Sequence, residues 1–311
     1  MTARTRQSVS SDARTGAATP DLEPVKPLLT PKRGRVLVIV AVALAALIGW
    51  LYLAATVMAV PEALRSALGP GMNLLNVGGS PQVPAFLTAL CAPVTLANGI
   101  DPTTVAVTVA MWAAMVFAMM LPTAVPMFTT YAAIAGRARR NGERVPSMGL
   151  LGAGYVSVWV AFAVVAGAAQ LGLVALGTMS PAMTPLAPAL AGTTLMAAGL
   201  YQLTPAKYAC LTRCRAPFSI LASRWRTTDY GMFRLGLEEG VYCLGCCWAL
   251  MVVMFAVGVM NVVWMAIFTV LMVAEKAGSG RALPRGIGIA LLLWGAMLFT
   301  LSEPGRRLLG L

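Results

Sequence analysis

The sequence predicts an all-α fold: a polytopic transmembrane helical bundle of about seven spans, with its N-terminus in the cytoplasm. Apolar residues make up 59% of the 311 residues and charged residues only 11%, whereas soluble domains are typically about 25% charged. Several uncharged stretches are long enough to cross a bilayer, which takes roughly 20 apolar residues in a helix. Basic residues collect in short blocks between these stretches. The expected location is therefore the cytoplasmic membrane, crossed several times.

The formal net charge of +12 points to the bilayer rather than to nucleic acid. Because the basic residues flank apolar runs, we interpret them as topology signals with anionic lipid as their partner, and we expect no nucleic-acid partner. The chain has no histidine, which excludes haem held by histidine, histidine-rich zinc catalysis and Ser-His-Asp hydrolysis. No catalytic residue is assigned, and the sequence leaves open whether the protein is an enzyme, with a non-enzymatic role favoured. Site chemistry falls to Cys, Met, Asp and Glu.

The N-terminal third is expected to hold one span. Residues 1–35 are polar and rich in Ser, Thr, Pro and Arg, as in a disordered cytoplasmic tail. Residues 36–60 carry no charge and follow a basic block, as in a signal-anchor transmembrane helix. Residues 61–104 form an outer loop, in which the apolar part 83–97 is interrupted by prolines and is expected to be re-entrant or interfacial rather than spanning.

Residues 105–302 are expected to form the main transmembrane helical domain, with a cytoplasmic, cysteine-bearing loop at 207–236 and a short tail at 303–311. Its spans are 105–128, 149–177, 188–206, 237–258, 262–274 and 287–301. Glu275 and Lys276 close one of these spans at the inner interface. Glu275 is the one acid considered for proton coupling, and an ordinary helix-end charge is the favoured explanation. With this topology 20 of the 23 Lys and Arg residues lie inside, as the positive-inside rule requires.

The stretch 236–254, GLEEGVYCLGCCWALMVVM, carries the densest group of potential ligands. On a helix, Glu239, Cys243, Cys246 and Cys247 fall within an arc of about 100°. Thiolate and thioether sulfur select soft metals such as Cu(I), and thiolate also suits Zn(II). Free Cys and Met are also ordinary core residues, so buried packing is the alternative explanation.

A second sulfur pattern lies in the span 105–128. Met111, Met115 and Met119 recur every four residues and share one helical stripe. Pro122 frees the carbonyl of Ala118, which then needs another partner inside a bilayer. The pattern favours either a ladder of weak thioether sites for a soft cation or a kink lined with flexible core side chains.

The remaining inner cysteines are Cys210 and Cys214, in the loop before the cluster. The cytoplasm keeps thiols reduced, so a structural disulfide framework is not expected there. One pair on a loop and a second group on a helix about 30 residues later resemble the spacing of four-sulfur metal sites. Cys91 is expected on the outer side.

Three segments give the chain a family resemblance. They are WAAMVFAMMLPTAVPMF at 112–128, YQLTPAKYACLTRCRAPF at 201–218, and 236–276 with its CLGCCWALM block. Together they resemble a family of predicted metal-binding integral membrane proteins whose domain has no known function. The resemblance implies a polytopic domain with a metal site at Cys210, Cys214, Cys243, Cys246 and Cys247. That family often carries histidine where this chain has Arg213 and Glu239, which leaves sulfur and carboxylate as ligands.

The leading hypothesis is an integral membrane protein that binds or transports a transition metal, Cu(I) or Zn, through a Cys/Met site near the cytoplasmic face. The weak transfer sites would be Met111, Met115 and Met119. The inner acceptor would be Cys210, Cys214, Glu239, Cys243, Cys246 and Cys247. The expected partners are the lipid bilayer, the metal ion, and a metallochaperone or membrane partner subunit.

Two other hypotheses remain open on the sequence. In a membrane thiol-disulfide redox protein, Cys243 and Cys246 would form a reversible pair that exchanges with Cys210 or Cys214. The partner would then be a quinone or a soluble thiol protein. In a non-catalytic membrane scaffold, the sulfur residues would only pack helices against one another.

Overall fold

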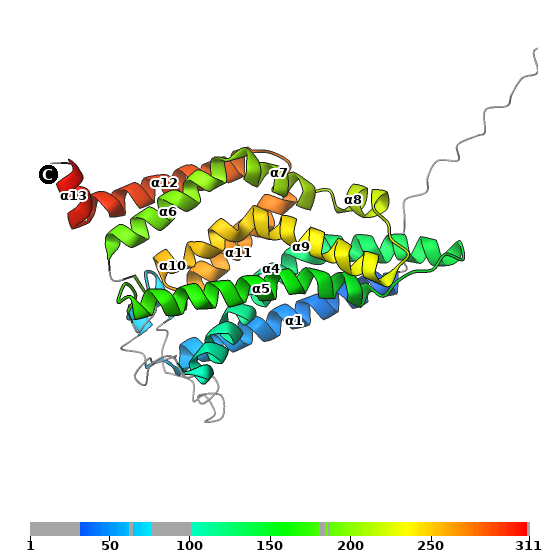
Figure 1. Ribbon diagram of the computed structural model, residues 1–311, viewed down its shortest axis with the longest axis horizontal. Coiled ribbons are helices and arrows are strands. Elements are labelled where there is room, and N and C mark those ends of the chain that lie inside the picture. The colour runs from blue at the N-terminus through cyan, green and yellow to red at the C-terminus, as the bar shows by residue number, and fades with distance from the viewer. Residues whose placement is uncertain (1–31, 62–64, 76–100, 181–183, 186, 310–311) are drawn as a thin grey trace, which may run out of the picture.

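The computed structural model describes residues 32–61, 65–75, 101–180, 184–185 and 187–309, which fold into a bundle of helices (Figure 1). Within these ranges the regular structure is helical, apart from an isolated antiparallel bridge between Met179 and Pro185. The prediction of an all-α fold is confirmed for the described part of the chain. The expected outer loop is described only at its two ends, and its segment 83–97 and Cys91 lie outside the described residues, as does the tail up to residue 31.

Seven of the helices in the described ranges are long, and the others there are short connecting elements. The long helices are α1 (Lys32–Ala59), α4 (Pro102–Arg140), α5 (Met148–Ala175), α6 (Pro188–Leu203), α9 (Asp229–Val252), α11 (Val262–Ala277) and α12 (Ala282–Leu301). The short ones are η1 (Ser66–Leu68), η2 (Met72–Leu75), α7 (Pro205–Cys214), α8 (Pro217–Ser223), α10 (Met254–Val257) and α13 (Glu303–Leu309). In Figure 1, α8, the end of α4 and the start of α9 lie at one end of the long axis, and α10 and α13 lie at the other.

Five of the described helices are long and apolar enough to cross a membrane, by length and composition. They are Val36–Ala59, Pro102–Arg140, Met148–Ala175, Asp229–Val257 and Ala282–Leu301. This is compatible with a membrane protein, although the sequence predicted about seven spans. The difference comes from α6 and α11, which have 16 residues each and are therefore only about 24 Å long. Each is shorter than the roughly 20 residues that a perpendicular crossing takes.

The helices begin where the sequence supplies capping side chains. Asp101, Ser147, Thr204, Thr228 and Asn261 each accept a hydrogen bond from a backbone N–H of the first helical turn. Such caps satisfy donors that the helix itself leaves unpaired. Thr204 caps α7 and Thr228 caps α9. The segment 207–236 is therefore not a simple loop, because it contains most of α7, all of α8 and the first turns of α9. The segment 303–311 likewise contains a helix, α13.

Glycines let α5 and α9 approach until their backbones touch. A Cβ atom on Gly236 would lie 2.1 Å from the carbonyl oxygen of Leu151, and one on Gly154 would lie 2.1 Å from the carbonyl oxygen of Phe233. Real Cβ atoms cannot come that close, so only glycine fits at both positions. This contact fixes α9 against α5 directly before the cysteines of α9.

A second glycine contact joins α6 to α12. A Cβ on Gly192 would lie 2.8 Å from the carbonyl oxygen of Gly295, and one on Gly199 would lie 2.8 Å from that of Gly288. The two helices run side by side along one flank of the bundle in Figure 1. Small residues at such positions are typical of helix pairs that pack in lipid, where close van der Waals contact replaces the hydrophobic effect.

Candidate metal centre

Four cysteines from two helices meet in the interior. Cys214 ends α7, and Cys243, Cys246 and Cys247 lie on α9; we call these four the thiol cluster. The sulfur atoms of Cys214 and Cys246 are 3.8 Å apart, and the sulfur of Cys247 is 3.5 Å from that of Met120 on α4. All four thiols are free. The structure thus places four of the five cysteines of the predicted site near one another, and Met120 of α4 adds a thioether.

Gly245 explains how α7 reaches the cluster. A Cβ at this position would lie 2.7 Å from the sulfur of Cys210, so the glycine inside the CLGCC sequence lets α7 lie directly on α9. The hydroxyl of Tyr201, at the end of α6, donates a hydrogen bond to the carbonyl of Gly245. Cys210 therefore contacts α9 beside the cluster, while Cys214, one turn later on α7, reaches Cys246.

Two thiols of the cluster point back at their own helix. Cys246 donates a hydrogen bond to the carbonyl oxygen of Cys243 at 3.1 Å, and Cys247 donates to the same oxygen at 2.8 Å. A thiol can donate in this way only while it carries its proton, because a thiolate has no hydrogen to give. As donors in these contacts, Cys246 and Cys247 carry their protons.

The sulfur of Cys243 has a different environment, because it receives donors from other helices. Lys276 of α11 donates to this sulfur at 3.0 Å and to the hydroxyl of Thr123 at 2.7 Å. The hydroxyl of Tyr155 on α5 is 3.1 Å from the same sulfur. An ammonium and a phenol beside one sulfur stabilise negative charge on it. Lys276, Thr123 and Tyr155 were not among the predicted site residues, since no spacing rule links them to the cysteines.

Glu239, one turn before Cys243, is paired with an arginine. Its Oε1 atom is 3.7 Å from a guanidinium nitrogen of Arg213, and that guanidinium lies 3.8 Å from the centre of the Tyr242 ring. The carboxylate is 95% buried, and Oε1 has no hydrogen-bond partner among the described residues. Arg213 and Glu239 are the two positions at which the resembled family often carries histidine, and here they are neighbours.

The methionines of α4 are buried, but they do not share one role. Met111, Met115 and Met119 belong to the core of the bundle, with Met115 and Met119 completely inaccessible. The thioether that touches the thiol cluster is that of Met120, one residue beyond the predicted stripe. Which methionine faces α9 depends on the rotation of α4 in the bundle, and the period of four residues did not reveal it.

A buried ion pair ties α7 to α11 close to the cluster. The ammonium of Lys207 lies 2.6 Å from Oε2 of Glu275, and the amide of Gln202 donates to Oε1 of the same carboxylate at 3.3 Å. Both charged side chains are almost fully buried. The expectation that Glu275 is an ordinary helix-end charge at the interface is therefore wrong: it has a lysine partner from another helix. Arg215 adds two hydrogen bonds to the carbonyl of Glu275 and one to that of Gly280.

The two thiols of α7 are held in their protonated form. Hydrogen bonds with Cys243 and Cys246, together with burial, raise the pKa of the Cys214 thiol. Burial raises the pKa of Cys210, and the nearby sulfur of Cys246 adds to the shift. A metal that binds Cys214 must therefore displace its proton.

The chemical type of the donor atoms fits a soft metal, but their present geometry does not yet enclose one. The cluster offers thiols and a thioether in a buried setting, which is the ligand chemistry of Cu(I). Within the part of the chain that the structure describes, however, no three side chains of the His, Cys, Asp and Glu types are grouped so as to hold a metal ion. Binding would require at least some of the thiols to turn inward.

The fold and the site together define an all-helical protein with membrane-length helices and a buried sulfur cluster. Residues 109–298, more than half of the chain, match the family model PpoB2, which is described as copper chaperone. The chain therefore belongs to this family, and the family's name suggests an association with copper. Comparisons with curated proteins and with solved structures gave no match.

Proposed function

We propose that this protein binds Cu(I) inside a membrane, holding it between α4, α7 and α9 through the thiol cluster and Met120, and passes it to a partner. The observation that carries the proposal is the 3.8 Å between the sulfur atoms of Cys214 and Cys246. Two thiolates that share a tetrahedral metal, with metal–sulfur bonds of about 2.3 Å, lie about 3.8 Å apart. The pair is thus spaced to share one ion, and membership of a copper chaperone family supports copper as that ion.

Charge balance favours Cu(I) over Zn(II) at this place. Two thiolates and one Cu(I) carry a net charge of −1, which the ammonium of Lys276, 3.0 Å from the sulfur of Cys243, offsets. With Zn(II) the same ligands would be neutral, and the partly buried ammonium of Lys276 would then have no negative charge on the cluster to pair with. The Met120 thioether adds a neutral soft donor without changing this balance.

Metal binding would release the two thiols that point back at α9. A thiol must lose its proton to bind a metal, and the thiolate can no longer donate to the carbonyl of Cys243. The hydrogen bonds of Cys246 and Cys247 to that oxygen, at 3.1 and 2.8 Å, would therefore break. Their sulfur atoms already lie beside those of Cys214 and Met120, at 3.8 and 3.5 Å, so a small rotation of each side chain would suffice to direct them at a shared ion.

Other predicted residues have secondary places in the proposal. Met115 and Met119 would be weak thioether sites along α4, from which the ion moves to the tighter thiol cluster. Cys210 lies beside the cluster on Gly245, and the buried Oε1 of Glu239, which accepts no hydrogen bond among the described residues, would provide an oxygen ligand. The site would face the cytoplasm, since the blocks of Lys and Arg predict that side for the loops around α7. A soluble metallochaperone or a membrane subunit would then receive or deliver the copper at the cytoplasmic membrane.

A competition titration tests the copper site. The full-length protein, purified in detergent under anaerobic conditions, is titrated with Cu(I) against a coloured chelator. The triple variant Cys243→Ser/Cys246→Ser/Cys247→Ser should lose the tight site, and Met120→Leu should bind about tenfold or more weakly if the thioether contributes a bond worth about 1.4 kcal/mol. Cys91→Ser removes a cysteine that the proposal does not use and should bind as the wild type. Unchanged binding by the triple variant would reject the proposal.

Thiol–disulfide exchange is the second candidate function, and the contact between Cys214 and Cys246 favours it as well. Oxidation would join the two sulfur atoms, release two protons and pass two electrons to a disulfide of a partner protein, which becomes two thiols. Mass spectrometry after mild oxidation and alkylation distinguishes the two functions. A disulfide between Cys214 and Cys246 that a soluble dithiol protein reduces would favour exchange, whereas thiols that stay reduced favour copper binding. If cysteine variants lose neither copper binding nor redox activity, the cysteines only pack helices, as in a membrane scaffold.

A further inference from the structure

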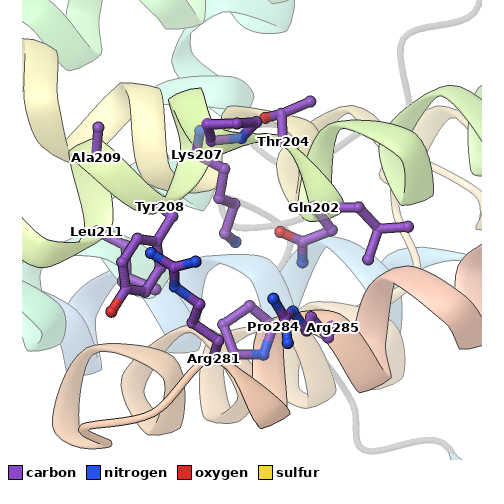
Figure 2. A pocket seen from close by; sticks show the side chains of 11 residues that line it. Gln202, Thr204, Lys207, Tyr208, Ala209, Leu211, Arg281, Pro284 and Arg285 are labelled. Atoms are coloured by element: carbon purple, nitrogen blue, oxygen red, sulfur yellow. The ribbon is translucent and has the colours of Figure 1, made fainter.

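A cavity of about 330 Å³ opens between α6, α7 and the start of α12, separate from the thiol cluster. Figure 2 shows the side chains that line it, among them Gln202, Lys207, Tyr208, Arg281 and Arg285. The first turn of α7, which also lines the cavity, contributes the positive end of a helix dipole. The cavity is therefore lined by three basic side chains and no acidic one.

The two arginines hold the free positive charge of the cavity. Lys207 is neutralised by Glu275 at 2.6 Å. The guanidinium of Arg281 lies 3.9 Å from the centre of the Tyr208 ring, which holds it in place without neutralising it. Arg285 has no acidic partner within 4.0 Å in the described part of the chain. Two solvent-accessible guanidinium groups at one cavity form a site suited to a phosphate group, which arginine binds through paired hydrogen bonds.

A buried acceptor gives the cavity a second requirement. Gln202 is only 3% exposed, and its Oε1 atom has no hydrogen-bond partner among the described residues. The orientation of the amide is set by Glu275, because only the NH₂ group can donate to that carboxylate, at 3.3 Å. The carbonyl oxygen of Gln202 is therefore left as an acceptor that needs a donor, and Figure 2 shows the amide pointing into the cavity. A phosphodiester has no hydroxyl group that could donate to Oε1 of Gln202 at neutral pH. The hydroxyl groups of a polyol can donate to it.

We propose that this cavity binds the headgroup of an anionic glycerophospholipid that carries free hydroxyl groups. The phosphate lies between Arg281 and Arg285, and a headgroup hydroxyl donates to Oε1 of Gln202. Exposed apolar side chains next to the cavity supply a surface for the acyl chains: Leu200 and Leu203 on α6 are 60% and 42% exposed. Basic pockets between transmembrane helices are a recurring way of holding anionic lipid. The site does not depend on copper binding.

Native mass spectrometry of the full-length protein in detergent tests this assignment. Phosphatidylglycerol and phosphatidylcholine with the same acyl chains are added separately, and inorganic phosphate is added in a third arm. The wild-type protein should retain phosphatidylglycerol with an affinity about tenfold or more above that for phosphatidylcholine, as expected for one or two charged hydrogen bonds. Arg285→Gln should remove most of this preference without altering the fold, because Arg285 is exposed and makes no ion pair in the described structure.

A matched variant controls for the loss of one positive charge, and each outcome either supports or overturns the lipid site. Arg306→Gln removes the same charge from α13, which follows the end of α12 opposite to the cavity, and should retain the wild-type preference. If Gln202→Met also lowers the preference for phosphatidylglycerol, the hydroxyl contact is supported. Saturation by inorganic phosphate that blocks lipid retention identifies a phosphate site filled from solution and overturns the assignment to lipid. Equal retention of the two lipids, or equal loss in Arg306→Gln and Arg285→Gln, overturns the site itself.

Discussion

Replacing Lys276 with methionine removes the positive charge nearest to the thiol cluster and keeps an unbranched side chain in its place. The metal-free cluster with protonated thiols is neutral and gains little from the ammonium. The cluster with Cu(I) on two thiolates carries −1 and is stabilised by it. Lys276→Met should therefore weaken Cu(I) binding, although a simple repulsion between two cations would suggest the opposite.

The size of the loss follows from the distance between the ammonium and the sulfur. At the 3.0 Å from Nζ of Lys276 to Sγ of Cys243, two unit charges attract by about 1.4 kcal/mol in the dielectric of water and by about 5.5 kcal/mol at an effective dielectric of about 20. Each 1.4 kcal/mol corresponds to about a factor of ten in affinity. Lys276 is only partly buried, so solvent screening places the effect toward the lower value. The expected loss is at least about tenfold.

The measurement is an anaerobic competition titration with Cu(I) at pH 7 on the purified full-length protein. Lys276→Arg keeps the charge and should stay close to the wild type. Arg306→Met removes one charge from α13 and should have no effect. Wild-type affinity in Lys276→Met, or an equal loss in Lys276→Arg, would refute the charge-balance reasoning. Tighter binding in Lys276→Met would show that repulsion dominates.

Three further predictions concern stability and are measured by thermal unfolding in detergent. Gly236→Ala places a methyl group 2.1 Å from a backbone oxygen of α5 and should lower the melting temperature, whereas Gly286→Ala, with nothing within 4 Å, should not; equal effects would contradict the role of the α5–α9 contact. Lys207→Met leaves the carboxylate of Glu275 buried without its cation and should cost about 3–5 kcal/mol, and the double variant Lys207→Met/Glu275→Met should recover most of the loss; no recovery would mean that packing, not charge, is responsible. Asn261→Ala removes the cap of α11 and the donor to the carbonyls at 70 and 257, so a loss of about 2 kcal/mol or more is expected, and an unchanged melting temperature would contradict it.

Most helices of the fold could be predicted from the sequence, because each is an uncharged stretch or begins at a capping residue. The stretch 36–60 was predicted as a helix from its lack of charge, and α1 covers it except for residue 60. Prediction was poorer where length is decided by neighbours. Helix α4 continues through Pro122 and Pro126 and on to Arg140, since the surrounding bundle tolerates the missing backbone bonds. The short α6 and α11 reduce the described membrane-length helices to five.

The candidate site could be predicted only in part from the sequence, because residue spacing describes one helix at a time. The periodicity of α9 placed Cys243, Cys246 and Cys247 on one face, and the pairing with Cys214 is the contact that the structure shows. Contacts across helices carry no such signal. Met120 was not distinguished from the stripe next to it. Lys276 was assigned to the interface because a charge that follows an apolar run is normally found there.

The attachment of α7 limits how copper can leave this protein. Lys207 and Arg215 fasten both halves of α7 to the end of α11, so Cys214 sits on a braced element and not on a flexible arm. A hinge that swings this cysteine away would have to break a dry ion pair. Under the proposed function, copper would therefore be transferred by stepwise ligand substitution. A sulfur of the incoming acceptor would bind the metal before one of the cluster's own sulfur atoms dissociates from it.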